Sequence, residues 1–474
     1  MAVDYEELGF KAGLEIHQQL EGKKLFCNCP TKIIDDKKEK PDLVVERQLR
    51  AVAGETGEID VAAVAEAKKS KIFKYWVYKE ACCEIELDDE PPHGPNMQAL
   101  TVALQVAKLL NCKIVDEVIF MRKTVIDGSN TSGFQRTALI GYNGWIDTSK
   151  GKVRIDGIFL EEEAAKIVKR TKEYDIYNLS RLGIPLIEIA TAADIKDPEH
   201  AKEVAHKIGL VLRSVSGIKR GLGTIRQDVN LSIKNGVRTE VKGFQDYRNI
   251  PKVIEYEVKR QLKAIKQGKK LKSEVRKAEP DFTTSFLRPM PGGARMYPET
   301  DIKHVKPEVG RLEVPMLIED KIKDLQKLGL GKDLATYAIK LNVYDTLKDF
   351  VDRYKNVKPT FIASSMLEMP KALGKKLSRK INVSMKQFDA IFGALDKGKI
   401  SKDAVESIII DISNDLFDLS KYELMSDATL KKELEKIVKA NKGKPFNVVI
   451  GIAMGKLKGK ADGKKIAEML KGMV

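Results

Sequence analysis

The sequence lacks the features of a secreted or membrane protein. Its first ten residues, MAVDYEELGF, are acidic and contain no apolar core of a secretory signal. No apolar run approaches the roughly 18 residues that a membrane-spanning helix needs. The 5 cysteines are an odd number, which argues against a framework of disulfides. We therefore expect a cytoplasmic protein with no membrane partner, whose cysteines are thiols or metal ligands.

The common motifs of nucleotide and hydrolytic enzymes are also absent. There is no GxxxxGK[ST] phosphate loop, because GLGKDL at residues 329–334 does not fit that pattern. The protein-kinase motifs and the GxSxG motif of serine hydrolases are missing as well. If the chain uses ATP, it must therefore bind it on an unusual fold.

What the sequence has in excess is positive charge. The 84 Lys and Arg residues against 68 Asp and Glu residues give 84 − 68 = +16. This excess favours an anionic partner, most simply nucleic acid, although a lysine-rich surface is the plain alternative. The segment 421–474 has 13 Lys and 6 acidic residues, so its net charge is 13 − 6 = +7.

The pattern of apolar residues changes along the chain. Residues 1–300 combine short strand-like runs with helical patterns at 96–111 and 197–215, the second opening on Asp197-Pro198. After residue 310 helical periodicity dominates, with a further boundary near residue 395. This pattern predicts an α+β protein, in which a mixed α/β domain precedes helical segments.

The segment GLEIHQQL, residues 13–20, predicts a strand with one polar face. Leu14 and Ile16 alternate with Glu15, His17 and Gln19. Successive side chains of a strand point to opposite faces, so the acid and the histidine share one face. A polar face that contains one of the 5 histidines beside a carboxylate is a candidate site.

Residues 221–244 predict a β-hairpin around Asn235-Gly236. We prefer a three-residue loop, with Gly236 left-handed, to a two-residue loop, because it pairs Asn230 with Glu240 and keeps both faces consistent. One face would then hold five charged or polar side chains: Arg226, Asp228, Asn230, Glu240 and Lys242. Such a face can hold Mg²⁺ and phosphate, or it can be an exposed face of salt bridges.

Three further segments concentrate charged residues. GIFLEEEAAKI contains Glu161, Glu162 and Glu163, which suit a cation or the acidic first turn of a helix. Residues 120–137 place Arg122 and Lys123 before a loop rich in Gly, Ser, Asn and Thr, which could cradle a phosphate or form a plain surface turn. Residues 286–302 join two arginines and two acidic residues in a Pro- and Gly-rich connection: Arg288, Arg295, Glu299 and Asp301.

Four cysteines form a candidate zinc site. Cys27 and Cys29 make a CxC pair, and Cys82 and Cys83 follow in a CC pair. Four thiolates are a common zinc ligand set, although the usual CxxC spacing is absent. These cysteines can equally be small buried residues, as we expect for Cys112.

Eight motifs occur together in the order of a known family. They are GLEIHQQL, LDDEPPHG, MRKTVIDGSNTSGFQRT, LEEEAAK, RLGIPLIEI, KRGLGTIRQDVNLSI, EVKGFQD and RPMPGGARMYPETDI. With them the chain resembles, over essentially its whole length, the family of the archaeal glutamyl-tRNA(Gln) amidotransferase E subunit and the bacterial and organellar B subunit. The inserted domain of archaeal E subunits, similar to one in bacterial aspartyl-tRNA synthetases, is missing before TTSFLRP.

The resemblance implies a ligase reaction. ATP would activate the side chain of glutamate on tRNA(Gln) as γ-glutamyl phosphate, and ammonia would then give glutaminyl-tRNA(Gln). It implies ATP and Mg²⁺ as cofactors and catalytic residues at Glu15, His17, Glu162, Asp228 and Glu240, of which all but Asp228 would bind Mg²⁺. The ATP and phosphate ligands would be Lys123, Gln135, Arg226, Lys242 and Arg295.

The resemblance also implies domains and partners. Residues 1–300 would form the catalytic cradle, 301–395 a helical domain and 396–474 a tRNA-binding tail. The ammonia would come through a tunnel from an asparaginase-like D subunit in a hetero-oligomer. Two alternatives remain: a B-type subunit that works with A and C subunits, also on aspartyl-tRNA(Asn), and a tRNA-binding scaffold without catalysis.

Overall fold

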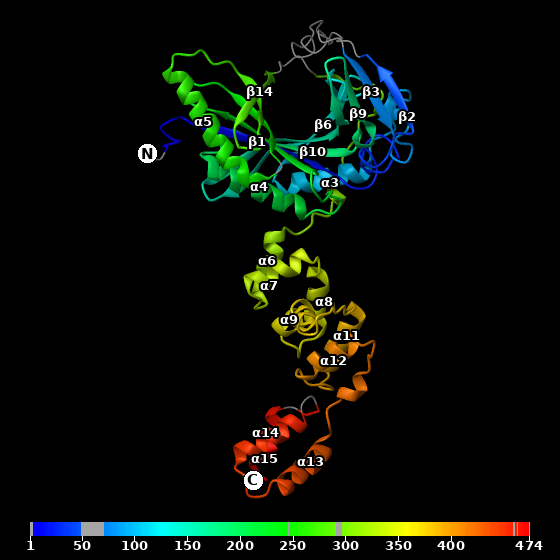
Figure 1. Ribbon diagram of the computed structural model, residues 1–474, viewed down its shortest axis with the longest axis vertical. Coiled ribbons are helices and arrows are strands. Elements are labelled where there is room, and N and C mark those ends of the chain that lie inside the picture. The colour runs from blue at the N-terminus through cyan, green and yellow to red at the C-terminus, as the bar shows by residue number, and fades with distance from the viewer. Residues whose placement is uncertain are drawn as a thin grey trace. The chain divides into compact units, whose positions relative to one another are not determined.

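The computed structural model describes residues 3–48, 71–244, 246–290, 296–457, 460–461 and 463–473 (Figure 1). The chain divides into two compact units, Met1–Leu317 and Ile318–Val474. Strands occur only in the first unit among the described residues, and helices make up the second. The predicted α+β class is therefore confirmed.

The first unit is built on a large sheet. Its described strands run in the order β14-β13-β12-β11-β1-β10-β7-β6-β5-β15, and β4 pairs with β6. Neighbours are antiparallel except β12 and β13. Their bounds in chain order are β1 (Lys11–Gln19), β4 (Lys113–Ile114), β5 (Phe120–Thr124), β6 (Phe134–Thr148), β7 (Gly151–Glu162), β10 (Pro185–Thr191), β11 (Ile225–Ser232), β12 (Thr239–Phe244), β13 (Glu274–Ala278), β14 (Thr284–Pro289) and β15 (Met296–Pro298).

Three helices cover one face of this sheet: α3 (Met97–Leu109), α4 (Pro198–Arg213) and α5 (Ile250–Lys266) (Figure 1). Helix α4 begins as predicted, because the Asp197 side chain accepts a hydrogen bond from the His200 backbone N–H at 2.9 Å. Leu14 and Ile16 of β1 are 1% and 0% exposed in the core beneath the helices. The opposite face of β1 therefore carries Glu15 and His17, as the alternation predicts.

The two edges of the large sheet lie near each other. Strand β14 ends at Pro289 and β15, at the other edge, begins at Met296. Seven residue steps of an extended chain span at most about 25 Å, so the sheet must curve strongly. The curvature turns the side chains of distant strands on the uncovered face toward one another.

A second sheet in the first unit has the order β2-β3-β9-β8. Its strands are β2 (Leu43–Arg47), β3 (Ile72–Val77), β8 (Lys166–Arg170) and β9 (Tyr174–Asn178). The short helix α2 (Glu84–Leu87) lies beside it and contributes Leu87 to its apolar core, with Tyr75 and Tyr177.

The second unit has two apolar cores, one from Leu325 to Ile412 and one from Leu430 to Leu470. Its helices are α6 (Ile318–Lys327), α7 (Lys332–Lys340), α8 (Tyr344–Arg353), α9 (Pro359–Leu367), α10 (Met369–Lys376), α11 (Met385–Asp396), α12 (Ala404–Ile412), α13 (Asp427–Ala440), α14 (Phe446–Lys456) and α15 (Gly463–Lys471). The domain boundaries at residues 300 and 395 stay predictions. Within the described residues, every helix is too short or too polar to span a membrane.

Candidate functional site

Strand β1 brings acidic residues of its two neighbours beside its own polar face. Glu15 lies opposite Asp228 of β11, and His17 lies opposite Glu188 of β10. His17 Nε2 is 3.3 Å from Glu188 Oε2. The predicted polar face is thus part of a larger cluster that extends over several strands.

The first group of possible cation ligands is His17, Glu161 and Glu188, which offer ligand atoms within 4.8 Å of one another. Lys123 Nζ lies 3.0 Å from Glu161 Oε2 and 3.8 Å from Glu188 Oε2. Burial raises the pKa of Glu188, but the His17 hydrogen bond and the charge of Lys123 outweigh it and lower the pKa to about 2. Glu188 is therefore ionised at neutral pH and can accept a cation.

The second group is Glu15, Asp228 and Glu240, again within 4.8 Å. Lys242 Nζ donates to Asp228 Oδ2 at 2.8 Å and also pairs with Glu240. Burial raises the pKa of Glu15 and Glu240 adds to this rise, while Lys242 opposes it. Three carboxylates share one ammonium here, and a divalent cation would relieve the remaining repulsion.

All of the first group, and Glu15 and Glu240 of the second, line one pocket of about 380 Å³. Its lining also includes Gln135, whose amide donates to the Glu162 backbone oxygen at 2.8 Å. The basic side chains in the lining are Lys123, Arg226, Arg238, Lys242 and Arg288. Oxygen ligands for Mg²⁺ beside cations for phosphate are the chemistry of a metal–nucleotide site.

The hairpin that carries part of this pocket has the predicted pairing of Asn230 with Glu240. The prediction that Gly236 is the left-handed residue of its loop is wrong, because Asn235 has that conformation, with φ 62°, and Gly236 does not. Asn tolerates this conformation, since its side chain can hydrogen-bond locally. Gly236 is needed for space, because a Cβ there would lie 2.3 Å from Gln261 Oε1.

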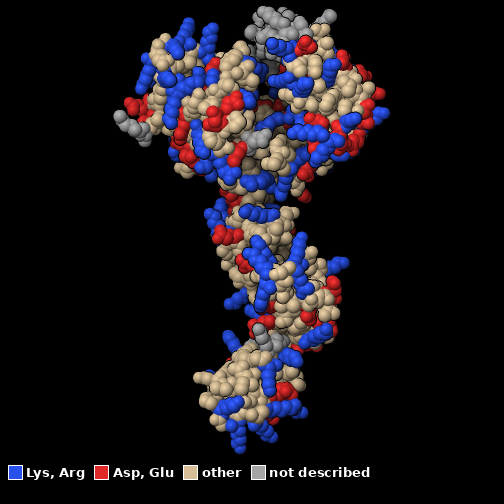
Figure 2. All heavy atoms as spheres, in the orientation of Figure 1, with Lys and Arg blue, Asp and Glu red and all other residues tan. Residues whose placement is uncertain are grey.

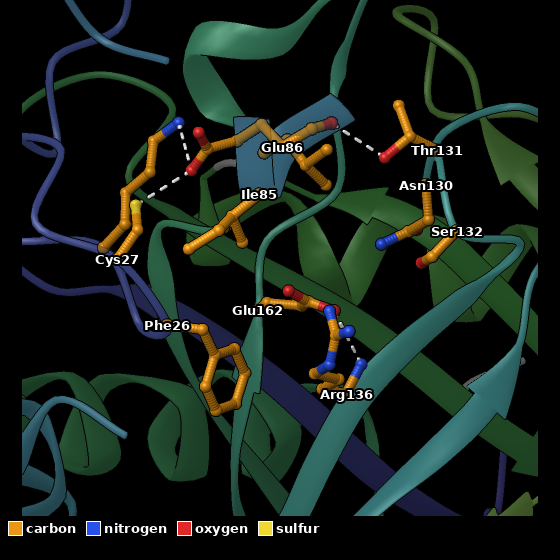
Figure 3. Close-up of a pocket in the computed structure, with 12 residues that line it drawn as sticks. Phe26, Cys27, Ile85, Glu86, Asn130, Thr131, Ser132, Arg136 and Glu162 are labelled. Carbon is orange, nitrogen blue, oxygen red and sulfur yellow. Dashed lines mark hydrogen bonds and ion pairs between the residues drawn. The ribbon is translucent and has the colours of Figure 1, made fainter. Parts of the chain in front are cut away.

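Glu162 points away from the two groups. It lines a second, enclosed pocket of about 20 Å³, together with Arg136 (Figure 3). Glu162 Oε1 accepts from the Arg136 backbone N–H at 2.9 Å, and Arg136 Nε donates to Glu299 Oε2 at 2.7 Å. Glu161 and Glu163 line the large pocket instead, so the structure does not bring Glu162 together with Glu15 and His17.

The two acidic residues predicted in the segment 286–302 do not line this pocket. Glu299 and Asp301 both accept hydrogen bonds from Arg122 Nη2, at 2.6 and 3.0 Å. Arg295 lies outside the described residues. The prediction that it binds phosphate therefore stays a prediction.

Residues 10–312 match the model of the GatB/GatE catalytic domain. Over 99% of both chains, the sequence is 34% identical to the E subunit of the glutamyl-tRNA(Gln) amidotransferase of Methanocaldococcus jannaschii. It is 33% identical to the corresponding E subunit of Sulfurisphaera tokodaii over 99% of this chain and 99% of that one. The chain belongs to the GatB/GatE family.

The family comparison also accounts for the chain's length. The alignment with the M. jannaschii protein has 628 positions against the 474 residues of this chain, so at least 628 − 474 = 154 positions are gaps in it. A difference of this size is about one domain. It agrees with the predicted absence of the inserted domain.

The cysteines of this GatB/GatE chain form a group that differs from the predicted one. Cys27, Cys29, Cys83 and Glu86 offer ligand atoms within 4.8 Å, and all five cysteines of the chain are free thiols. Figure 3 shows Cys27 and Glu86 side by side, with Cys27 Sγ donating to Glu86 Oε1 at 3.0 Å. Cys82 packs instead in the apolar core of the small sheet. Three thiols and a carboxylate fit zinc.

Glu188 was not among the residues that the sequence patterns singled out. It stands between Ile187 and Ile189, which are buried in the core, just as Glu15 stands between Leu14 and Ile16. The same alternation could therefore have found it. Glu162 was instead taken from the family resemblance. The residue pattern does not choose between Glu161 and Glu162, because Ile158, Phe159 and Leu160 are all apolar and do not show which face of β7 is buried.

Proposed function

We propose that the chain activates the side chain of glutamate on tRNA(Gln) with ATP and passes it to ammonia, forming glutaminyl-tRNA(Gln). It would thus be a ligase that forms a carbon–nitrogen bond, as the name of its relatives suggests. The arrangement that supports this most directly is the pocket with two groups of carboxylates beside five basic side chains.

The reaction has two steps. An oxygen of the γ-carboxylate attacks the γ-phosphorus of ATP, ADP leaves, and γ-glutamyl phosphate forms. Ammonia then attacks the acyl carbon, the phosphate leaves, and the amide loses a proton. Both steps need the substrates to be held in line and their negative charge to be neutralised, rather than a covalent enzyme intermediate.

The residues of the pocket divide these tasks. Lys123, Arg226 and Lys242 neutralise phosphate oxygens, and Gln135 can hydrogen-bond a neighbouring polar group. The two groups, His17 with Glu161 and Glu188 and Glu15 with Asp228 and Glu240, would hold Mg²⁺. Bound Mg²⁺ supplies charge neutralisation between ATP and the carboxylate. Glu161 and Glu188 thus take the place predicted for Glu162.

The remaining assignments rest on the family and on charge. Ammonia would come from an asparaginase-like D subunit, a choice that the E-type relatives favour over a B-type assembly with A and C subunits. Residues 301–395 would be the helical domain and 396–474 the tail that binds tRNA. Lys and Arg are spread over the second unit (Figure 2), which suits an RNA backbone. Cytoplasmic localisation stays a prediction.

We also propose that zinc binds to Cys27, Cys29, Cys83 and Glu86. The group lies on segments that border the small enclosed pocket, because Cys27 and Glu86 both line it. Zinc would tie the segment around residue 27 to the helix α2 and so support the fold rather than the reaction.

The test is product formation from glutamyl-tRNA(Gln), ATP, Mg²⁺ and ammonium, comparing the wild type with Asp228→Asn. We expect product from the wild type and a fall of at least about 100-fold in the variant, since a cation ligand is lost. Asp175→Asn is the matched control: Asp175 is also buried and pairs with a lysine, Lys71, at 2.9 Å, but in the small sheet. It should keep the wild-type rate.

Either of two results would contradict the proposal. One is full activity of Asp228→Asn. The other is no product from the wild type both with ammonium and with a D-type subunit present, while tRNA still binds. That second result would favour the scaffold without catalysis.

A further inference from the structure

Arg226 lies at the wall of the large pocket beside the first cation group. It stands opposite His17 in the pairing of β1 with β11, and its side chain is 32% exposed. Its Nη2 donates a hydrogen bond to Glu163 Oε1 at 2.8 Å. A guanidinium has five N–H donors, so this bond leaves others to bind an anion.

Glu163 is only 2% exposed, and its side chain and backbone are both hydrogen-bonded within the protein. Its second oxygen, Oε2, accepts from Gln19 Nε2 at 3.0 Å. Its backbone N–H donates to the Ile184 oxygen at 2.8 Å, and its backbone oxygen accepts from the Gly183 N–H at 2.9 Å. Both carboxylate oxygens are therefore hydrogen-bonded by protein side chains.

A second guanidinium fixes the chain directly after Glu163. Arg181 Nε donates to the Ala164 oxygen and its Nη2 to the Ala165 oxygen, both at 2.8 Å. Arg181, in the turn that precedes β10, thus holds the backbone of the segment that follows Glu163 in place. A carboxylate on such a rigid support can set the direction of a longer, more mobile side chain.

We propose that Glu163 is a positioning residue that orients Arg226 toward the phosphates of ATP. This inference rests on the proposed function. Glu163 belongs to neither group of possible cation ligands. It holds one terminal nitrogen of Arg226 so that the remaining donors face the pocket. Without it, Arg226 would still be present and charged but would spend most of its time in other conformations.

The test measures KM for ATP, KM for glutamyl-tRNA(Gln) and kcat in the chain with its amidase partner. Glu163→Gln should raise KM for ATP about tenfold, the loss expected for one charge-assisted hydrogen bond, and lower kcat. KM for glutamyl-tRNA(Gln) should stay within about twofold of the wild type. A general loss of structure would instead lower the fraction of active enzyme, and KM for ATP would not rise selectively over KM for glutamyl-tRNA(Gln).

A double-mutant cycle with Arg226→Gln decides the mechanism. If Glu163 acts through Arg226, Glu163→Gln adds less than about twofold to the KM for ATP once Arg226 is replaced. Independent, multiplying effects would overturn the inference. If Glu163→Gln fails to fold, Gln19→Leu removes only the donor to Glu163 and should change KM for ATP in the same direction by a smaller factor.

Glu257→Gln is the matched control. Glu257 is also a fully buried carboxylate between two guanidiniums, with Arg260 at 2.7 Å and Arg276 at 3.5 Å, but it lies on α5. Its replacement should lower the melting temperature and leave KM for ATP unchanged. A wild type that makes no product overturns the proposed function; an active wild type with equal KM values in Glu163→Gln overturns this inference alone.

Discussion

The end of strand β7 separates two charged clusters of opposite character. On one side Glu161 and Glu163 face a pocket of about 380 Å³, where carboxylates crowd around a few ammonium groups. On the other side Glu162 faces a pocket of about 20 Å³ and is paired with Arg136, which also holds the buried Glu299. Paired charges around the small pocket stabilise the fold, whereas carboxylates gathered around the larger pocket leave room for cations and substrate.

The largest expected difference between the clusters is in catalysis. Glu188→Gln removes a ligand of the first cation group and should lower kcat at least about 100-fold. Glu162→Gln changes the enclosed cluster and should stay within about threefold of the wild type. Steady-state product formation measures both, and an equal loss in Glu162→Gln would restore that residue as a catalytic group.

The loss of stability should be larger for a substitution in the cluster around Glu162 than for one beside the large pocket. Arg136→Met leaves Glu162 and Glu299 buried without their shared partner and should lower the free energy of unfolding by about 3–5 kcal/mol. Lys123→Met, on the pocket side, removes a half-buried ammonium and should cost less than about 1 kcal/mol. Urea unfolding measures both, and a larger loss in Lys123→Met would contradict the division between the clusters.

The pH dependence of the enclosed cluster gives a smaller effect. Burial raises the pKa of Glu299, but hydrogen bonds from Arg122 and Arg136 outweigh it and keep the pKa below its usual value. The stability that Glu299 contributes is therefore present above the unfolded pKa of about 4.3 and is lost as the pH falls through the folded pKa. The wild type should be more stable than Glu299→Gln by about 2 kcal/mol at pH 7.

This gap should shrink as the pH falls below about 4.3. Urea unfolding of the two proteins from pH 7 to pH 3 follows it directly. A gap that widens toward acid would show that the Glu299 carboxylate is not held ionised by the two arginines.

The smallest expected effect on product formation is at the cysteines beside the enclosed pocket. Cys83→Ser should lose bound zinc, whereas Cys82→Ser should keep it, because Cys82 lies in the apolar core. Both should keep kcat within about twofold if zinc supports only the fold. Metal analysis of the purified proteins distinguishes them, and loss of zinc in Cys82→Ser would favour the four-cysteine site.

The sequence predicted the parts of the site that strict alternation defines. Glu15 and His17 alternate with buried Leu14 and Ile16, and the pairing of Asn230 with Glu240 followed from the two faces of the hairpin. These features depend on neighbours along the chain or across one turn, which a strand pattern records.

What the sequence left undecided depends on contacts between distant strands. The apolar run Ile158, Phe159 and Leu160 does not show which face of β7 is buried, so the pattern could not correct the choice of Glu162 that the family resemblance implied. The role of Glu86 beside Cys27 depends on two segments 59 residues apart. The strong curvature that gathers these strands was also invisible to local patterns, because it follows from the whole sheet order.

The most direct test of the account follows one oxygen atom. Glutamyl-tRNA(Gln) labelled with ¹⁸O in the side-chain carboxylate is incubated with the enzyme, ATP, Mg²⁺ and ammonium, and the released phosphate is analysed by mass spectrometry. If the pocket activates the carboxylate as γ-glutamyl phosphate, each glutaminyl-tRNA(Gln) formed is accompanied by one ¹⁸O atom in phosphate, and Glu188→Gln gives almost neither. Product formation with no ¹⁸O in the phosphate would contradict the account.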